Sequence, residues 1–569
     1  MPRHITSSSR SLLPLAITAL LCAVVSVSIT SSADAVDGGT LRVNPRNGWL
    51  AFEVISIGDD PASDGFNWPM PGTFDGIGAW QPDPLTLRLQ INHEIGDATI
   101  SEVDLSLASF ETAISNMISG GTTGGVSFVN SARQAYDRWS RDGGVNWFST
   151  TDTSNTSFSR FCSSQSYGAN TFGIDRGFVD EIYITGEEVA SGRLIALDLA
   201  HRDFYQLSGV SGSASGGIGG MPRDAWENAA LLDTGETDHV ALLLSPDGGT
   251  QRMKMYIGEK GKDADGNAST DFLARNGLAY GSYYYLNDAL PSSGTSINGS
   301  FDTTASGALS SSKLEDVDTS PSDPTQAVLG DQDSGLFTFD FTFDFGGGNF
   351  SASGSVFSIT KIQGHVNNTV GQFGNADNVD WIDATTLNGT TYADGLIFVN
   401  EDNDNGEIWM SEPDGSGLVK IGDTVGISGS RESSGILDVS DMLGFRPGSI
   451  LLTDNQGSNA SLTVLINPDA DVAAEFAADF DGDGDVDGDD FLAWQGGFGP
   501  QTGAQKSDGD YDSDGDVDGD DFLGWQTEFG LGSDSAIAAV PEPVSAILVL
   551  VVAIAGTLSR RVEISRLLC

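Results

Sequence analysis

Two stretches near the C-terminus place aspartates at alternate positions, a pattern suited to binding a hard cation. They read DFDGDGDVDGDDFLAWQGGFG (residues 479–499) and DYDSDGDVDGDDFLGWQTEFG (residues 510–530). In each stretch, aspartates at positions 1, 3, 5, 9 and 12 accompany a glycine at position 6, which is the ligand spacing of an EF-hand calcium loop. Oxygen ligands at this density favour Ca²⁺ over softer metals. The sequence therefore predicts two calcium ions, one in each loop.

The predicted calcium ligands are all aspartates. Those of the first loop are Asp479, Asp481, Asp483, Asp485, Asp487 and Asp490. Those of the second loop are Asp510, Asp512, Asp514, Asp516, Asp518 and Asp521. The position-7 residues, Asp485 and Asp516, would contribute their peptide carbonyls. Position 12 is aspartate where an EF-hand usually has glutamate, so we expect weaker or more hydrated binding because the shorter side chain reaches less far.

An amphipathic segment follows each loop. Its aromatic residues are spaced as one stripe of a short helix: Phe491, Trp494 and Phe498, then Phe522, Trp525 and Phe529. A calcium loop with one exiting helix, present twice over residues 475–531, resembles a type I dockerin domain. That resemblance implies a cohesin-like partner protein. The alternative is a solvated acidic linker, but a linker would not keep Gly, Val, Phe and Trp in phase.

Further candidate ligands are scattered through the preceding part of the chain. They are Glu94, Cys162, Glu188, Glu227 and Glu315, with Lys313 close to the last. The other cysteines are Cys22 and Cys569 near the chain ends, so no disulfide framework is expected. An unpaired thiol can be a soft metal ligand or simply a small buried side chain. Glu187 is the alternative to Glu188, since adjacent residues of a strand face opposite sides.

The order of these segments resembles the PhoX-type alkaline phosphatases, in patches over residues 45–465. That family implies an exported propeller whose axial site holds Ca²⁺ and Fe³⁺ and hydrolyses phosphate esters. Carried over by position, the metal ligands would be Glu94, Cys162, Glu188, Glu227 and Glu315, and the catalytic residues Lys313 and Glu315. Three positions depart from the family pattern: Gly186 replaces Cys, Trp226 replaces His and Lys313 replaces Arg. Lysine lacks the bidentate fork with which arginine holds a phosphate.

The scaffold for these residues, residues 36–470, has the pattern of a β protein. Short apolar runs such as 50–57, 85–92, 240–244 and 396–399 alternate with turn clusters such as 402–406. Because this length exceeds one sandwich, we predict a mainly β fold with a β-propeller-like body of roughly five to seven blades, followed by the small α dockerin-type module. The Ser/Gly/Thr-rich stretches 206–220 and 291–312 are expected to be surface insertions.

Both chain ends carry targeting patterns. Basic residues, an apolar run (12–27) and Ala33-Asp34-Ala35 predict a signal peptide of residues 1–35. Residues 536–569 contain Pro-Glu-Pro, the apolar run 544–558 and two arginines, an order that resembles a PEP-CTERM sorting signal. That resemblance implies an exosortase-type processing enzyme and an exported protein at the envelope, surface or exterior of a Gram-negative bacterium. A membrane anchor is the alternative at either end.

The charge balance limits the possible partners. The formal net charge of −53 excludes nucleic acid as an expected partner, because phosphate backbones require clustered Lys and Arg. It also means that an anionic phosphate ester could bind only where metal ions reverse the local charge. Two functions stay open. The first is a PhoX-like phosphomonoesterase with a calcium-binding attachment module, and the second is a non-catalytic extracellular propeller that binds other molecules.

Overall fold

The computed structural model describes residues 41–529, except 62–64, 151–157, 208–219, 248–251, 288–289, 293, 367–368, 428–431, 471–477, 482–485, 500–503 and 512–514. The predicted signal peptide and sorting signal lie outside the described residues. Within the described part of the chain, no helix is long and apolar enough to cross a membrane.

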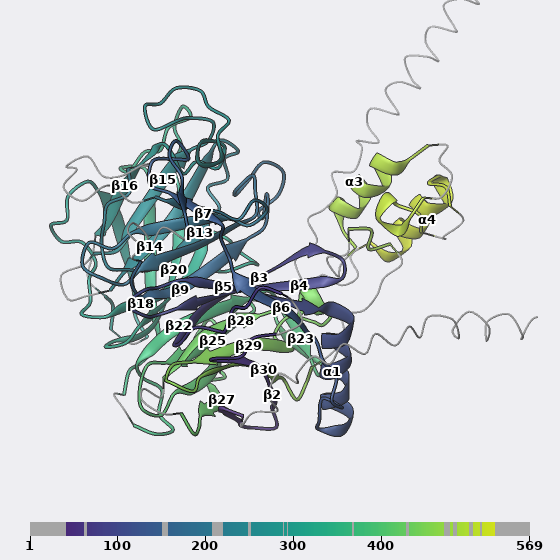
Figure 1. Cartoon of the computed structure of the whole chain (residues 1–569). Helices are drawn as coiled ribbons and strands as arrows, with labels where there is room; N and C mark the ends of the chain where they lie inside the picture. Colours follow the sequence, from purple (N-terminus) through teal and green to yellow (C-terminus); the bar gives the residue numbers. More distant parts are fainter. Residues whose placement is uncertain are drawn as a thin grey trace, which may run out of the picture.

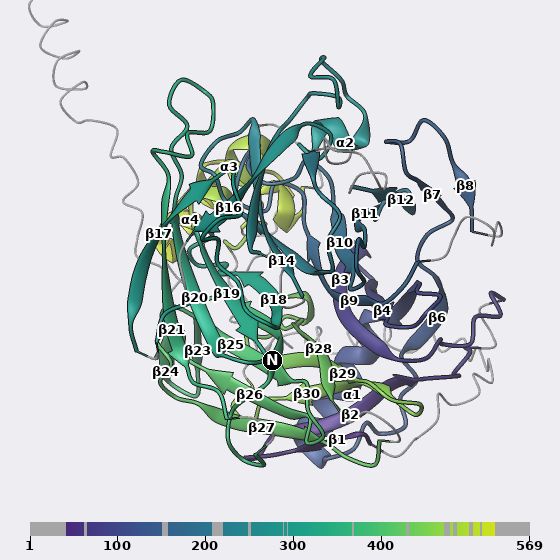
Figure 2. The ribbon, with the colours of Figure 1, turned by 90° about the vertical axis from the view of Figure 1, so that its left-hand side faces the viewer.

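A closed ring of strands forms the centre of the body (Figure 2). Each strand packs beside the next, and the last packs against the first; they are β3 (Phe74–Asp83), β9 (Phe161–Tyr167), β13 (Trp226–Leu232), β18 (Leu314–Thr319), β22 (Ala376–Ile382) and β28 (Ser433–Asp438). A sheet extends outward from each of them, and all strand pairs in these sheets are antiparallel except β12 with β7. The described residues thus form a β-propeller of six blades, and the predicted mainly β propeller fold is confirmed.

Blades 1, 2 and 5 are separate sheets. Blade 1 contains β3, β4 (Thr86–His93), β5 (Ile100–Ser106) and β6 (Val129–Gln134). Blade 2 contains β9, β10 (Ile182–Glu187), β11 (Leu194–Asp198), β12 (Asp203–Gln206), β7 (Arg138–Ser140) and β8 (Phe148–Ser149). Blade 5 contains β22, β25 (Leu396–Glu401), β26 (Glu407–Ser411), β27 (Val419–Thr424) and β1 (Val43–Pro45). The hairpin β23 (Thr385–Leu387) and β24 (Thr390–Tyr392) forms its own small sheet.

Blades 3 and 4 share one nine-stranded sheet. Blade 3 contains β13, β14 (His239–Pro246), β15 (Lys254–Glu259) and β16 (Gly281–Asn287). Blade 4 contains β18, β19 (Gln326–Asp331), β20 (Gly335–Thr342) and β21 (Val356–Gln363). Their outer edges are joined by β17 (Ser296–Asp302), which pairs with both β16 and β21. The expectation that 291–312 is a surface insertion was therefore wrong. Polar residues of this stretch form β17, the strand that joins the outer edges of blades 3 and 4, and Phe301 of β17 packs into the core.

The N-terminal part of the chain closes the ring. Blade 6 contains β28, β29 (Ile450–Asn455) and β30 (Ser461–Ile466), and its outermost strand is β2 (Leu50–Ser56). β2 pairs antiparallel with β30, with Leu50 opposite Ile466. Strands from the two ends of the body are thus joined by backbone hydrogen bonds. The outer edge of β30, which would otherwise have no partner strand, is covered by β2.

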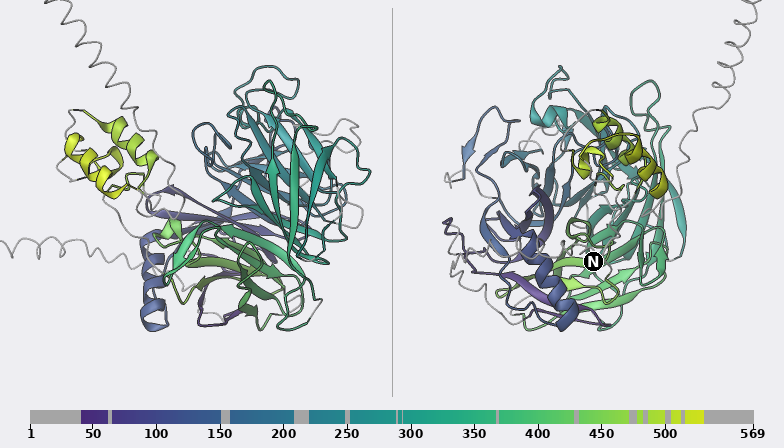
Figure 3. Two further views of the ribbon diagram at one scale, coloured as in Figure 1. Left: turned by 180° about the vertical axis from the view of Figure 1, so that it is seen from behind. Right: turned by 90° about the vertical axis from the view of Figure 1, so that its right-hand side faces the viewer.

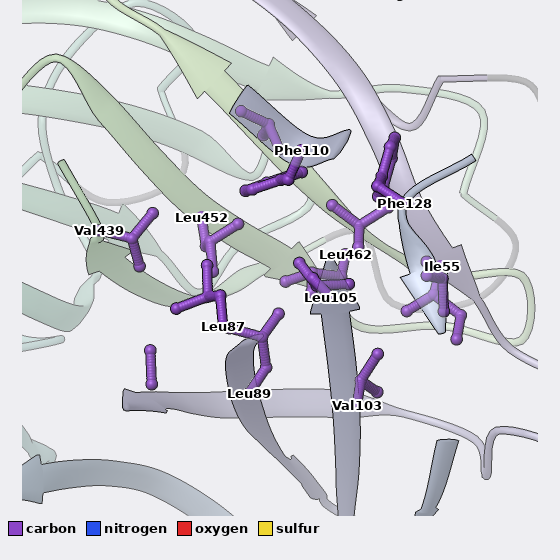
Figure 4. Close-up of a cluster of buried hydrophobic side chains, with 14 of the residues drawn as sticks. Ile55, Leu87, Leu89, Val103, Leu105, Phe110, Phe128, Val439, Leu452 and Leu462 are labelled. Atoms are coloured by element: carbon purple, nitrogen blue, oxygen red, sulfur yellow. The ribbon is translucent and has the colours of Figure 1, made fainter. Parts of the chain in front are cut away.

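Helix α1 (Leu107–Gly120) covers the apolar core between blades 1 and 6. Its buried residues follow helical spacing: Phe110, Ala113, Ile114 and Met117. The helix ends at Gly121, whose φ of 71° is the left-handed conformation that glycine adopts readily. Figure 4 shows side chains of blade 1 and blade 6 meeting beside Phe110, among them Leu105 and Leu462. The sequence pattern did not predict this helix.

The remaining short elements lie outside the blades. They are α2 (Phe272–Arg275) and the 3₁₀ turn η2 (Asp441–Leu443). After residue 477 come α3 (Gly488–Gly497), the 3₁₀ turn η3 (Lys506–Asp508) and α4 (Gly519–Glu528). Figures 1 and 3 show α3 and α4 packed against each other as a small helical unit.

Aspartates link neighbouring blades near the axis. The carboxylate of Asp318 in blade 4 accepts a hydrogen bond from the backbone N–H of Trp381 in blade 5 (2.7 Å). Asp380 of blade 5 accepts one from the N–H of Asp438 in blade 6 (2.6 Å). Because these innermost strands lie in separate sheets, their inward edges carry backbone groups without a ladder partner. The carboxylates supply those partners.

Removing one such link should destabilise the ring. Asp318→Ala deprives the buried N–H groups of Thr319 and Trp381 of their acceptor. We expect the free energy of unfolding to fall by about 1–3 kcal/mol for each unsatisfied group, measured by urea denaturation. Asp340→Ala is the control, since Asp340 lies exposed on β20 of the same blade. Equal midpoints for the two variants would contradict the role assigned to Asp318.

Candidate metal centre

A β-bulge recurs at the same place in every blade. The first residue of each innermost strand lies opposite the last residue of the second strand, as in Phe74↔His93 of blade 1 and Ala376↔Glu401 of blade 5. The regular register is then interrupted before pairing resumes, and this happens in all six blades. A bulge turns a side chain out of the normal alternation and is common beside active sites.

The bulge brings two residues of every blade toward the axis. One is the second residue of the innermost strand: Asp75, Cys162, Glu227, Glu315, Asp377 and Ser434. The other directly follows the second strand: Glu94, Glu188, Asp247, Gln332, Asp402 and Gln456. We call these residues the axial cluster. Repetition of one hairpin geometry around the ring thus concentrates carboxylates at one end of the axis.

The ligand atoms of this cluster lie close enough to share metal ions. Those of Asp75, Glu94 and Cys162 lie within 4.8 Å of one another, and so do those of Cys162, Glu188 and Glu227. The Cys162 thiol donates to Glu188 Oε2 over 3.3 Å. The fifth residue predicted from the sequence, Glu315, is 3.2 Å from Lys313 Nζ and interacts electrostatically with Glu227. The structure therefore brings all five predicted propeller ligands together.

Glu188 lies in the cluster, whereas its alternative, Glu187, lies outside it. The buried carboxylate of Glu187 pairs with Arg193 and accepts a hydrogen bond from the backbone of Ser159 (2.9 Å). This ion pair belongs to blade 2 and accounts for the burial of Glu187. At the end of β10, Glu187 thus forms a structural ion pair, whereas the adjacent Glu188 faces the axis.

Two cationic side chains contact the cluster from its rim. Lys313 Nζ lies 3.1 Å from Asp247 Oδ2 and 3.2 Å from Glu315 Oε1. Arg160 contacts Glu94 Oε1 at 2.5 Å and also pairs with Glu188. Burial lowers the pKa of both cationic groups, but the surrounding carboxylates outweigh that effect and hold each pKa above its usual value. Among the described residues the cluster therefore has more acids than bases.

The imbalance shifts the pKa values of the acids upward. Burial is the main cause for Asp75, Glu227, Glu315 and Asp377, and neighbouring carboxylates add to it. Burial and the adjacent Asp247 raise the pKa of Glu188 to about 7. Burial also raises the pKa of the Cys162 thiol, again with help from neighbouring carboxylates. Without a cation the cluster must retain protons, and a bound cation would replace them.

One carboxylate oxygen of the cluster has no hydrogen-bond donor. Asp247 Oδ1 is buried and accepts no hydrogen bond within the described structure. Buried carboxylate oxygens are normally satisfied, so unsatisfied ones indicate an ion or water that would complete them. The donor set also fits a metal: many carboxylate oxygens suit Ca²⁺, and one thiol suits iron.

A contact across the axis closes the cluster on its inner side. Asn378 Nδ2 of blade 5 donates to Ser163 Oγ of blade 2 (3.1 Å), and both residues are buried. Ser163 in turn donates to Glu227 Oε2 (3.4 Å). Blades 2 and 5 are opposite each other in the ring, so this contact spans it. A ligand would consequently approach from the side where Arg160 and Lys313 lie.

Several residues of the cluster were missed by sequence reasoning. They are Asp75, Asp247, Asp377 and Asp402; Arg160, which contacts the cluster from its rim, was missed as well. The available signal was positional: each acid is either the second residue of an innermost strand or the residue after the next strand. Finding it required the strand register, because single carboxylates in an acidic sequence are common.

Two of the three departures from the PhoX pattern form one packing contact. A Cβ placed on Gly186 would lie 2.3 Å from the Cβ of Trp226, so a larger residue at 186 cannot accompany this tryptophan. Trp226 is fully buried in the apolar cluster between blades 2 and 3. Its neighbour Glu227 faces the axis instead. The glycine and the tryptophan therefore compensate each other outside the axial cluster.

The C-terminal loops also gather carboxylates. Asp479, Asp481 and Asp490 offer atoms within 4.8 Å of one another, as do Asp516, Asp518 and Asp521. Asp510 is buried, and its Oδ1 accepts no hydrogen bond in the described structure. Asp487 caps helix α3 through the N–H of Asp489. The remaining predicted ligands, Asp483, Asp485, Asp512 and Asp514, lie outside the described residues.

The two repeats exchange matching hydrogen bonds. Trp494 of the first helix donates its indole N–H to the carbonyl of Asp518 in the second loop (2.9 Å). Trp525 of the second helix donates to the carbonyl of Asp487 in the first loop (2.9 Å). Each tryptophan thus holds the position-9 residue of the other loop. Both predicted aromatic stripes extend one residue beyond the observed helix: α3 ends at Gly497 and α4 at Glu528, so Phe498 and Phe529 lie just after the helices, and Phe498 is exposed.

Comparisons with known proteins find no close relative. No family model matches the chain, and no curated protein matches it. Among solved structures it is similar to the Dos1 propeller, with 8% identity and a TM-score of 0.29 over 70% of this chain and 68% of that one. An ancestral GH74 enzyme gives 11% identity and a TM-score of 0.34 over 76% and 52%. The Cps50 (Swd1) β-propeller domain of Myceliophteria thermophila gives 10% and 0.30 over 69% and 96%.

The axial carboxylates should make stability depend on pH. The pKa of Glu188 is about 7 in the folded protein and near 4.5 in an unfolded chain. Because the folded state holds the proton more tightly, this contribution is complete below about pH 4.5 and is lost as the pH rises through about 7. The Tm of the metal-free protein should therefore fall between about pH 5 and pH 8, and excess Ca²⁺ should reduce the fall.

Glu188→Gln should weaken that pH dependence, because the amide does not titrate. Asp265→Asn, in an exposed turn of blade 3, is the matched control and should retain the wild-type slope. Differential scanning calorimetry of the metal-free proteins across this pH range provides the measurement. A wild-type Tm that is flat or rises with pH would contradict the arrangement of buried acids described above.

Calcium binding by the second predicted loop can be tested through Asp510. Asp510→Asn removes the charge from its buried carboxylate at position 1, so the full chain should bind one Ca²⁺ fewer than the wild type. Asp489→Asn removes the same charge from an exposed residue of α3 and should bind the wild-type number. Calorimetric titration gives the stoichiometry, and tryptophan fluorescence reports the coupled loops. Equal stoichiometry for the two variants would refute the assignment.

Proposed function

We propose that this protein is a metal-dependent phosphomonoesterase with a calcium-binding attachment module. One observation carries the proposal: ligands assigned from separate sequence segments converge at one end of the propeller axis, around Cys162. Glu94, Cys162, Glu188, Glu227 and Glu315 would hold Ca²⁺ and Fe³⁺. The fold itself is not an argument for this activity, because propellers serve many functions.

The chain's own residues have distinct roles in this proposal. The buried carboxylates bind and orient cations, which when present polarise a phosphoryl oxygen and offset its charge. Lys313 is placed to hold a phosphoryl oxygen as a point charge. Its ammonium group lies between the carboxylates of Asp247 and Glu315 and contacts both. The contact between Asn378 and Ser163 closes the inner side, which limits the water that reaches the site.

The attachment module is a second part of the proposal. The paired loops after residue 477 would bind two calcium ions and present α3 and α4 to a cohesin-like protein. The packing of the two repeats through Trp494 and Trp525 supports a folded unit rather than a linker. With the predicted signal peptide and sorting signal, the protein would act at the cell surface or outside the cell of a Gram-negative bacterium, after processing by an exosortase-type enzyme.

A non-catalytic propeller is the second candidate. Lys313 stands where the resemblance leads us to expect arginine, and in this structure it is engaged with Asp247 and Glu315. A protein that retained the metal ligands but not phosphoryl transfer would bind cations and anionic ligands without turning them over. Metal content and hydrolysis therefore have to be measured separately.

The decisive experiment uses the full chain loaded with Ca²⁺ and iron. We expect bound iron by elemental analysis and hydrolysis of p-nitrophenyl phosphate, and we expect Cys162→Ser and Glu227→Gln to lower the rate at least about a thousandfold. Glu259→Gln, a partly exposed carboxylate paired with Lys262, should keep the wild-type rate. Metal binding without hydrolysis would favour the non-catalytic propeller. Absence of both would end the metal-site proposal.

A further inference from the structure

We propose that Arg160 binds the anion at the axial site, and that it competes with the metal for Glu94 and Glu188. This inference rests on the proposed function and makes it more specific: the ligand would be a tetrahedral oxyanion such as a phosphate monoester. Nothing in the sequence pattern marked Arg160, which lies two residues before Cys162. Its position in the structure draws attention to it.

The backbone of Arg160 is fixed between two arms of the axial cluster. Its N–H donates to the carbonyl of Ile95 (2.9 Å), the residue after Glu94, and its carbonyl accepts from the N–H of Glu188 (2.9 Å). Its φ is 54°, in the left-handed region that residues other than glycine rarely adopt. Such conformations persist where the surroundings enforce them, and they concentrate at functional sites.

The guanidinium lies at the boundary between the cluster and solvent. The Arg160 side chain is 48% exposed, whereas the side chains of Glu94 and Glu188 are 9% and 10% exposed. Both carboxylate contacts are made by Nη2. Within the described structure, the outer edge of the guanidinium therefore remains available to another acceptor. A planar fork of this kind matches two oxygens of a phosphate group.

Arg160 and Lys313 hold the cluster from two different blades. Arg160 comes from blade 2 and contacts Glu94 and Glu188, while Lys313 comes from blade 4 and contacts Asp247 and Glu315. Both cations also act electrostatically on Glu94. An anion entering from the rim would meet a positive group on each side, above cations bound by the acids. Arg160 thus supplies the guanidinium that is expected at position 313 but is replaced there by the lysine ammonium.

A purely structural role for Arg160 predicts a different response. Arg160 pairs with Glu94 Oε1 and Glu188 Oε2, and both carboxylates also belong to the candidate metal groups around Cys162. If the guanidinium competes with the metal, its removal should leave Ca²⁺ binding unchanged or tighter. If it only positions the ligands, its removal should weaken Ca²⁺ binding. Metal affinity and anion affinity consequently separate the two roles.

The test measures both affinities calorimetrically on the full chain. Ca²⁺ is titrated first, and inorganic phosphate is then titrated into the Ca²⁺-loaded protein. For Arg160→Gln we expect phosphate affinity to fall by about tenfold to a hundredfold, because a charge-assisted bidentate contact is lost. Ca²⁺ affinity should not fall. The phosphate affinity of Arg160→Lys should lie between those of the wild type and Arg160→Gln, since lysine keeps the charge but lacks the planar fork of arginine.

Arg138→Gln is the control variant. Arg138 also lies in blade 2, is 49% exposed and pairs with Asp203 away from the axis, so both affinities should stay at the wild-type values. Unchanged phosphate binding in Arg160→Gln, or weaker Ca²⁺ binding in it, would overturn the inference. Phosphate binding that depends on Arg160 without any ester hydrolysis would support the inference while rejecting the esterase function.

Discussion

Electrostatic repulsion at the propeller axis is the constraint on which the site depends. The strands of the ring bring acids such as Asp75, Glu227 and Glu315 into a space shielded from water, where charges interact strongly. Arg160 and Lys313 offset part of that charge. Protons or metal ions must offset the rest, since isolated buried carboxylates are costly to ionise. Burial and composition together therefore require that the cluster either retains protons or binds cations.

The bulge explains why one architecture can build such a site. A regular hairpin would turn alternate side chains toward the neighbouring blades, whereas the shifted register turns the second residue of each innermost strand to the axis. Blades 1 to 5 use that position for an acid or Cys162, and blade 6 has Ser434 instead. The site is thus asymmetric within a repeated backbone, with its acids contributed mainly by blades 1 to 5.

Much of the fold could be predicted because it depends on local pattern. Apolar runs separated by turns indicated the strands, and the length indicated a propeller. Helix α1 and strand β17 were missed: the first replaces a turn between strands, and the second is rich in polar residues at a shared edge. For the site, Cys162 and Glu94 stood out through resemblance to a family. Asp377 and Arg160 did not, because their meaning depends on strand register and a left-handed backbone.

Closure of the ring by β2 and β30 has a consequence for how the protein matures. Strand β2, near the start of the body, pairs with β30, its last strand, so blade 6 cannot be completed until the chain has been synthesised as far as residue 466. The axial ligands from different blades have no common geometry before that moment. A metal ion held by residues of several blades could therefore bind only after the ring has closed. If the axial cluster holds a metal ion, the ions present where the ring closes, as well as the affinity of the ligands, would decide which one is bound.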